Sequence, residues 1–225
     1  AVGMLFLGLA LRRLAGQVEG GGRQGVWVRL CAGIPLALGL LTLGEYAFGG
    51  DTGIDQLLFR DPDPHATSHA GRMAPETACA FVLLGLSFLA VDLKTRKGRR
   101  PAQGLALAVA ILAVMALMGY LYGLPVLYQI AGFTSMALHT APLFLLLSAG
   151  FLCARPEAGF MEAVASPCAG GFMARRLLPA ILVLLPFLGW VCLQGQEAGL
   201  YGTEFGVVLV IASSMVLLSV LVCYR

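Results

Sequence analysis

Long stretches without a charged residue constrain this chain more than any other feature of its sequence. Charged residues make up 12% of the 225 positions and lie in clusters, whereas a soluble domain carries about 25%. A run of about 20 apolar residues crosses the roughly 30 Å hydrocarbon core of a bilayer as a helix. The runs are continuous rather than alternating, which favours helices over a β-barrel. We expect one all-α transmembrane domain over 1–225, a polytopic bundle with helices at about 1–11, 30–48, 74–91, 102–122, 136–153, 177–194 and 204–223.

The basic residues fall on one side of these seven predicted spans. Thirteen of the 15 Lys and Arg residues lie in the segments 12–29, 92–101 and 154–176 or at Arg225. By the positive-inside rule this side is cytoplasmic, which predicts a cytoplasmic C-terminus. The net charge of +3 therefore reflects topology. The sequence has no basic stripe interleaved with aromatic residues, so we do not expect nucleic acid as a partner.

An internal repeat divides the spans into hairpins. The segment "MAPETACAFVLLGLSFL" (73–89) aligns without a gap on "MALHTAPLFLLLSAGFL" (136–152). The preceding helices correspond too, because Tyr46, Tyr120 and Trp190 each lie near the outer end of an ascending span. The repeated unit is predicted to be a helical hairpin that ascends from the cytoplasm and descends again after an outer segment.

The first span matches the descending half of this unit. Residues 1–11 align on 78–88, with Gly8 on Gly85. We therefore expect an eighth helix upstream of the sequence given. The last span runs into the cytoplasm at Arg225, and we expect further sequence there as well.

Titratable residues gather at the outer ends of the spans. The repeat places Glu76, His139 and Glu204 at matching positions in the first turn of each descending helix. A carboxylate near a helix N-terminus is stabilised by about 0.3–1 kcal/mol, which is the structural interpretation of the two glutamates. His139 fits this less well, because a cation is disfavoured there.

Glu45 lies about one turn inside the outer end of the second span, beside Tyr46. Either its carboxylate reaches the membrane surface along an extended side chain, or it faces the bundle interior. In the second case it can pair with Arg72 or His139. The candidate ligand site at the outer mouth consists of Glu45, Tyr46, His69, Arg72, Glu76 and His139.

The histidines are the weak candidates for metal binding: His65, His69 and His139. Two histidines four apart on a helix can bind Zn²⁺ or Cu²⁺, but "DPDPHATSHAG" has the composition of a loop. Haem ligation, metal binding and a solvated or hydrogen-bonding role stay open, and the sequence requires no cofactor. It also contains no nucleophile elbow, Walker loop or HExxH motif, so we predict no catalytic residues here.

The motifs "YAFGGDTGIDQLLF", "HAGRMAPETACAFVLLGLSFL", "GYLYG", "TSMALHTAPLFLLLSAGFLCARP" and "ARRLLPA" resemble the multi-pass N-terminal membrane domain of bacterial sensor histidine kinases and related diguanylate cyclases. The resemblance covers nearly the whole chain. It implies a location in the bacterial inner membrane, with PAS, dimerisation and catalytic domains in a cytoplasmic part outside this sequence. It transfers no ligand residues.

The expected function is therefore that of a membrane-embedded sensory input domain, with the lipid bilayer as its surroundings and a homodimer formed through cytoplasmic domains. The alternatives are an accessory or cofactor- or lipid-binding subunit of a membrane complex and, third, a transporter. Transport folds are often built from repeats, but charge within these spans is nearly absent.

Overall fold

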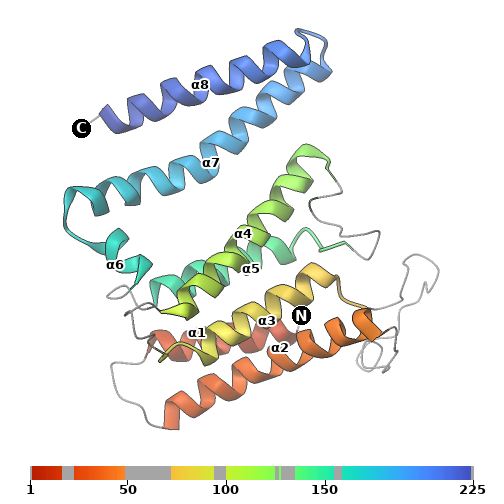
Figure 1. Ribbon diagram of the computed structural model, residues 1–225, viewed down its shortest axis with the longest axis vertical. Helices are drawn as coiled ribbons and strands as arrows, with labels where there is room; N and C mark the ends of the chain where they lie inside the picture. The colour runs from red at the N-terminus through yellow and green to blue at the C-terminus, as the bar shows by residue number, and fades with distance from the viewer. Residues whose placement is uncertain are drawn as a thin grey trace. The chain divides into compact units, whose positions relative to one another are not determined.

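The chain is all-helical over the residues that the computed structural model describes, which are 2–16, 23–48, 72–93, 100–124, 127, 135–154 and 159–223; no β-strand occurs among them. This confirms the all-α part of the predicted fold class. Every predicted apolar segment coincides with a helix, and one short helix, α6, is additional (Figure 1). The helices are α1 Val2–Ala15, α2 Arg23–Phe48, α3 Pro75–Leu89, α4 Pro101–Tyr122, α5 Thr140–Cys153, α6 Phe160–Ala165, α7 Ala169–Glu197 and α8 Thr203–Cys223.

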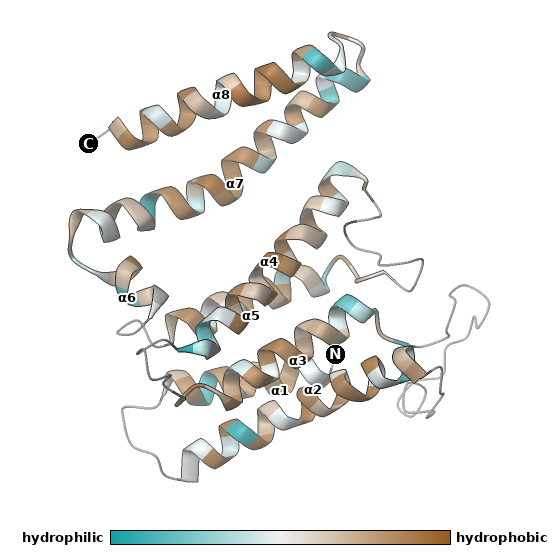
Figure 2. Cartoon of the chain, in the orientation of Figure 1, coloured by the Kyte–Doolittle hydropathy of each residue, from teal (hydrophilic) through white to brown (hydrophobic). Residues whose placement is uncertain are grey.

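Four of the described helices are long and apolar enough to cross a membrane: α2, α4, α7 and α8. They indicate a membrane protein. Figure 2 shows hydrophobic residues along most of α7 and α8, with hydrophilic residues near the turn that joins them. Helices α3 and α5 are apolar but shorter, with 15 and 14 residues. The predicted count of seven membrane spans stays a prediction.

The chain divides into two compact units, Ala1–Gly159 with α1 to α5 and Phe160–Arg225 with α6 to α8. In the second unit α7 and α8 pack against each other as an antiparallel pair. The Tyr201 hydroxyl donates a hydrogen bond to the Cys192 carbonyl over 2.9 Å and closes the end of this pair. The Arg175 guanidinium donates to the Val164 carbonyl over 2.9 Å and holds α6 against α7.

Glycines bring α2 and α3 together in the first unit. A Cβ atom at Gly39 would lie 2.7 Å from the Ala78 carbonyl oxygen, and one at Gly85 would lie 2.8 Å from the Leu36 Cβ. Small residues permit this close backbone approach, which is the usual way in which membrane helices gain packing energy. Helices α4 and α5 pack as a second antiparallel pair. We call α2 with α3 hairpin 1 and α4 with α5 hairpin 2.

The two ascending helices bury the same positions of the predicted repeat. When Tyr46 is aligned on Tyr120, each buried residue in the last six turns of α2 falls on a buried residue of α4. In α2 these residues are Val28, Ala32, Pro35, Gly39, Thr42 and Glu45; in α4 they are Ala102, Ala106, Val109, Ala113, Ala116 and Gly119.

The descending helices α3 and α5 meet through equivalent aromatic residues. Phe81 contacts Phe144 edge to face, with ring centroids 5.1 Å apart, and Phe88 contacts Phe151 in the same way at 4.8 Å. Such pairs contribute about 0.5–1.5 kcal/mol beyond the apolar area they bury. Because each ring faces its own counterpart in the alignment, α3 and α5 present the same face to each other.

Non-helical residues precede the short helix α3. At 1.5 Å per residue the 15 residues of α3 span about 22 Å. Residues 72–74 are not helical, and three residues add at most about 10 Å. Together they match the roughly 30 Å of a hydrocarbon core. Non-helical backbone within a membrane is tolerated only where its polar groups are satisfied within the protein.

Candidate functional site

Glu45 lies in the last turn of α2, one position before Tyr46, and is buried. An isolated buried carboxylate would cost several kcal/mol, so it requires a partner. Of the two placements left open by the sequence, the structure therefore has the inward-facing one. The apolar stripe of α2 determines this placement, because Glu45 continues the series of buried positions that ends with Gly39 and Thr42.

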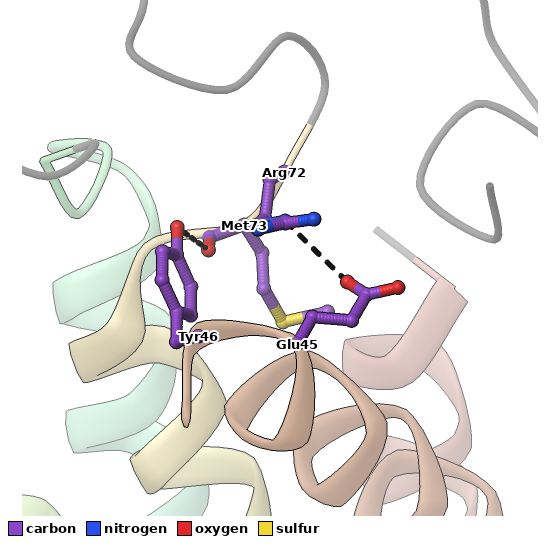
Figure 3. A network of polar contacts seen from close by, with 4 residues as sticks. All are labelled: Glu45, Tyr46, Arg72 and Met73. Atoms are coloured by element: carbon purple, nitrogen blue, oxygen red, sulfur yellow. Dashed lines mark hydrogen bonds and ion pairs between the residues drawn. The ribbon is translucent and has the colours of Figure 1, made fainter. Parts of the chain in front are cut away.

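Arg72 supplies the partner from the extended residues before α3. Its Nε atom lies 3.4 Å from the Glu45 Oε2 atom, and both side chains are only 4% exposed (Figure 3). At this distance two unit charges attract by about 5 kcal/mol for an effective dielectric constant of about 20. The desolvation of both groups offsets much of that attraction, so the pair fixes geometry more than it adds stability.

Tyr46 connects the ion pair to the backbone. The Arg72 guanidinium carbon lies 5.3 Å from the centre of the Tyr46 ring, within range of a cation–π interaction. The Tyr46 hydroxyl donates a hydrogen bond to the Met73 carbonyl oxygen over 3.0 Å. Figure 3 shows Arg72 and Met73 between the end of α2 and the start of α3, with the Tyr46 ring on one side and Glu45 on the other. The hydroxyl thus satisfies a carbonyl of the extended segment.

Hairpin 2 repeats the tyrosine contact without the ion pair. The Tyr120 hydroxyl donates a hydrogen bond to the Met136 carbonyl oxygen, and these two residues align on Tyr46 and Met73. Gly119 and Ser135 stand at the positions of Glu45 and Arg72. The ion pair is therefore the chemical difference between two otherwise corresponding helix ends.

Glu76 lies in the first turn of α3 and is buried. Ala74 at the N-cap makes no side-chain hydrogen bond to the helix, and Pro75 occupies the first helical position. A carboxylate in the first turn of a helix without a side-chain cap is favoured by the exposed N–H groups and the helix dipole, which agrees with the structural interpretation of this residue.

His139 occupies the N-cap position of α5, is exposed, and makes no side-chain cap hydrogen bond. No contact joins it to Glu45, Arg72 or Tyr46 among the described interactions. His65 and His69 lie outside the described residues. The structure therefore brings together Glu45, Tyr46 and Arg72 of the predicted site, and it places Glu76 in the first turn of α3.

Among the residues that the structure describes, no group of three or more His, Cys, Asp and Glu side chains could hold a metal ion. The six cysteines are free thiols, and they are distributed over both units. The Glu45–Arg72–Tyr46 cluster can hold the end of α2 to the residues before α3 in one arrangement. A new charge or hydrogen bond at the cluster would change the strength of this connection. The contribution of the Met73 carbonyl was not predicted, although the repeated Met at 73 and 136 is the signal that could have suggested it.

Comparisons with known proteins give no family for this chain: no family model, no curated protein and no solved structure matches it.

Proposed function

We propose that this chain is the membrane-embedded sensory input domain of a bacterial signalling protein of the sensor histidine kinase type. The observation that carries the proposal is the buried Glu45–Arg72 ion pair at the predicted outer end of hairpin 1. Ionisable residues within membrane segments are expensive and usually mark a functional site. The resemblance of the sequence to such input domains supports the same conclusion.

The proposed topology is seven spans built from repeated hairpins in the bacterial inner membrane, with the C-terminus in the cytoplasm. The matching buried positions of α2 and α4 support the repeat. The tyrosine-to-carbonyl hydrogen bonds in both hairpins support it independently. The one-sided distribution of Lys and Arg supports the orientation.

The difference between the hairpins supports a sensory role for hairpin 1. A purely structural repeat would have no need for Glu45 and Arg72, because hairpin 2 closes its outer end with Gly119 and Ser135. Buried ion pairs tend to add little stability compared with apolar residues. A retained pair at one of two corresponding ends is therefore better explained by a function that uses its charge.

Signalling would proceed by a shift between two arrangements of the outer helix ends. A ligand, lipid, quinone or redox change that binds one arrangement better than the other moves the population toward it. In hairpin 1 the ion pair holds the end of α2 to the segment that leads into α3. Breaking or strengthening this connection changes the position of α3, whose aromatic face contacts α5. The output domains, and dimerisation through them, would lie in cytoplasmic sequence outside this chain.

The test uses the natural full-length protein in proteoliposomes, with ATP-dependent histidine phosphorylation as the readout. We expect the rate to change when residues 43–76 are replaced by the corresponding hairpin 2 segment, 117–139. An unchanged rate, both in this exchange and after deletion of the membrane region, would refute the proposal. A reading frame without an output domain would instead favour the accessory-subunit alternative.

A further inference from the structure

Gln103 is a buried polar residue in the first turn of α4. The other buried residues of this helix are small or apolar. The neighbouring Ala102 is fixed to α3, because the Ser87 hydroxyl donates a hydrogen bond to the Ala102 carbonyl over 2.6 Å. Burying an amide costs free energy unless polar contacts compensate for it. Gln103 therefore stands on a helix end whose position is fixed, and its burial calls for an explanation.

Gly159, the last residue of the first unit, lies against the Gln103 side chain. A Cβ atom at Gly159 would overlap the Gln103 amide oxygen and would lie 3.1 Å from the Gln103 Cδ. The φ angle of Gly159 is 66°, in the left-handed region that glycine adopts readily. Two separate features, the backbone angle and the close approach, thus favour glycine at this position. The next residue, Phe160, begins α6.

The repeat gives hairpin 1 a more exposed contact at the corresponding place. Aligning Tyr120 on Tyr46 places Gln103 on Arg29. Arg29 pairs over 3.5 Å with Asp92, which follows α3, and both side chains are more than half exposed. Such a pair contributes about 0–1 kcal/mol. Both ascending helices thus use this position to contact the chain that leaves a descending helix, and in hairpin 2 the contacting side chain is buried.

We propose that Gln103 and Gly159 form a latch that fixes the point at which the chain leaves the first unit. The chain is continuous from Gly159 into α6. A displacement of the start of α4 would therefore move the start of α6 with it. The latch gives hairpin 2 a direct connection to the second unit, and this connection is independent of what the protein senses.

A turn glycine alone would explain the φ angle of Gly159 but not its contact. Gly123, the C-cap residue of α4, has a φ angle of 64°, and a Cβ atom there would have nothing within 4 Å. Asparagine also adopts the left-handed conformation. A glycine-to-asparagine substitution at either position can therefore keep the backbone angle while adding a side chain. The two substitutions differ in whether that side chain meets Gln103.

Hydrogen–deuterium exchange of the whole chain in lipid nanodiscs tests the latch. The readout is the exchange of residues 160–165, which follow the latch and contain none of the substituted residues. Gly159→Asn should speed this exchange about tenfold, which corresponds to about 1.4 kcal/mol of local opening, whereas Gly123→Asn should leave it unchanged. Gln103→Ala removes the amide and should speed the exchange as Gly159→Asn does. The double variant should exchange no faster than Gln103→Ala alone, because the added side chain then meets no amide.

Equal exchange of residues 160–165 in Gly159→Asn and Gly123→Asn would overturn the proposal, since glycine would then serve the backbone angle alone. An unchanged rate in Gln103→Ala would overturn it too, as would effects of the two substitutions that add in the double variant. Exchange of α4 and α5 in the same samples should stay at the rate of the unaltered chain. Faster exchange throughout these helices would mean that the substitutions unfold hairpin 2 as a whole, which would contradict a local latch.

Discussion

Replacing one member of the Glu45–Arg72 pair by methionine should destabilise the first unit strongly. Both side chains are 4% exposed and their charged atoms lie 3.4 Å apart. Removing one partner leaves the other charge buried, at a cost of about 3–5 kcal/mol. The effect should greatly exceed that of breaking the Arg29–Asp92 pair, whose side chains are more than half exposed and which contributes about 0–1 kcal/mol.

The double substitution Glu45→Met with Arg72→Met decides whether charge is the cause. Two apolar side chains of similar length leave neither member of the pair as an unpaired charge, so the double variant should lose less stability than either single variant. Unfolding by SDS in mixed micelles measures this. With Trp190→Phe as background, Trp27 is the remaining tryptophan and reports on α2. Single substitutions that cost less than 1 kcal/mol, or a double variant whose loss equals the sum of the two within about 0.5 kcal/mol, would refute the reasoning.

Three further comparisons test the packing of the first unit by the same unfolding assay. Tyr46→Phe and Tyr120→Phe should each cost about 1–3 kcal/mol, because each leaves a carbonyl of the extended segment without its hydrogen bond; equal stability of both variants and the unaltered chain would contradict this. Gly85→Ala should cost about 1–3 kcal/mol because the added methyl group clashes with α2. Gly104→Ala should be neutral or stabilise the chain by up to about 1 kcal/mol. If both variants lost stability, or neither did, the described packing of α2 on α3 would be wrong. Phe151→Leu should cost about 1 kcal/mol by removing the edge-to-face contact with α3, and the argument fails if leucine is tolerated without loss.

The number and order of the apolar helices could be predicted because hydropathy is summed over many residues. Their ends could not. Helix α7 begins at Ala169 and includes Arg175, although the apolar segment was predicted from 177. Hydropathy finds the part of a helix that lies in lipid, while hydrogen bonding continues the helix beyond it. Conversely, α5 begins at Thr140 rather than at 136, because the backbone before it is held by Tyr120 from another helix.

The candidate site was predictable as a set of positions but not as a set of contacts. Glu45 and Tyr46 stood out because a charge and an aromatic residue end an otherwise apolar span. Arg72 was one of two possible partners, and choosing it required the buried stripe of α2 and the extended backbone before α3. His139 occupies the same repeat position as Glu76 yet is exposed, since α5 lacks the second buried face that makes α3 the more enclosed helix.

The central claim is that the charge pair at the end of hairpin 1 controls output, and one exchange of residues tests it most directly. The variant Glu45→Gly with Arg72→Ser gives hairpin 1 the residues that hairpin 2 has at Gly119 and Ser135. The matched control is Thr42→Ala. Thr42 is another buried polar residue of hairpin 1, the substitution introduces the alanine that hairpin 2 has at position 116, and the Glu45–Arg72 pair stays intact. In the full-length protein in proteoliposomes, we predict that the paired exchange changes the ratio of the two signalling states about tenfold, which corresponds to about 1.4 kcal/mol. Resting histidine phosphorylation should change with that ratio, and the control should leave it unchanged. Phosphorylation at the unaltered rate in the paired exchange would contradict the account.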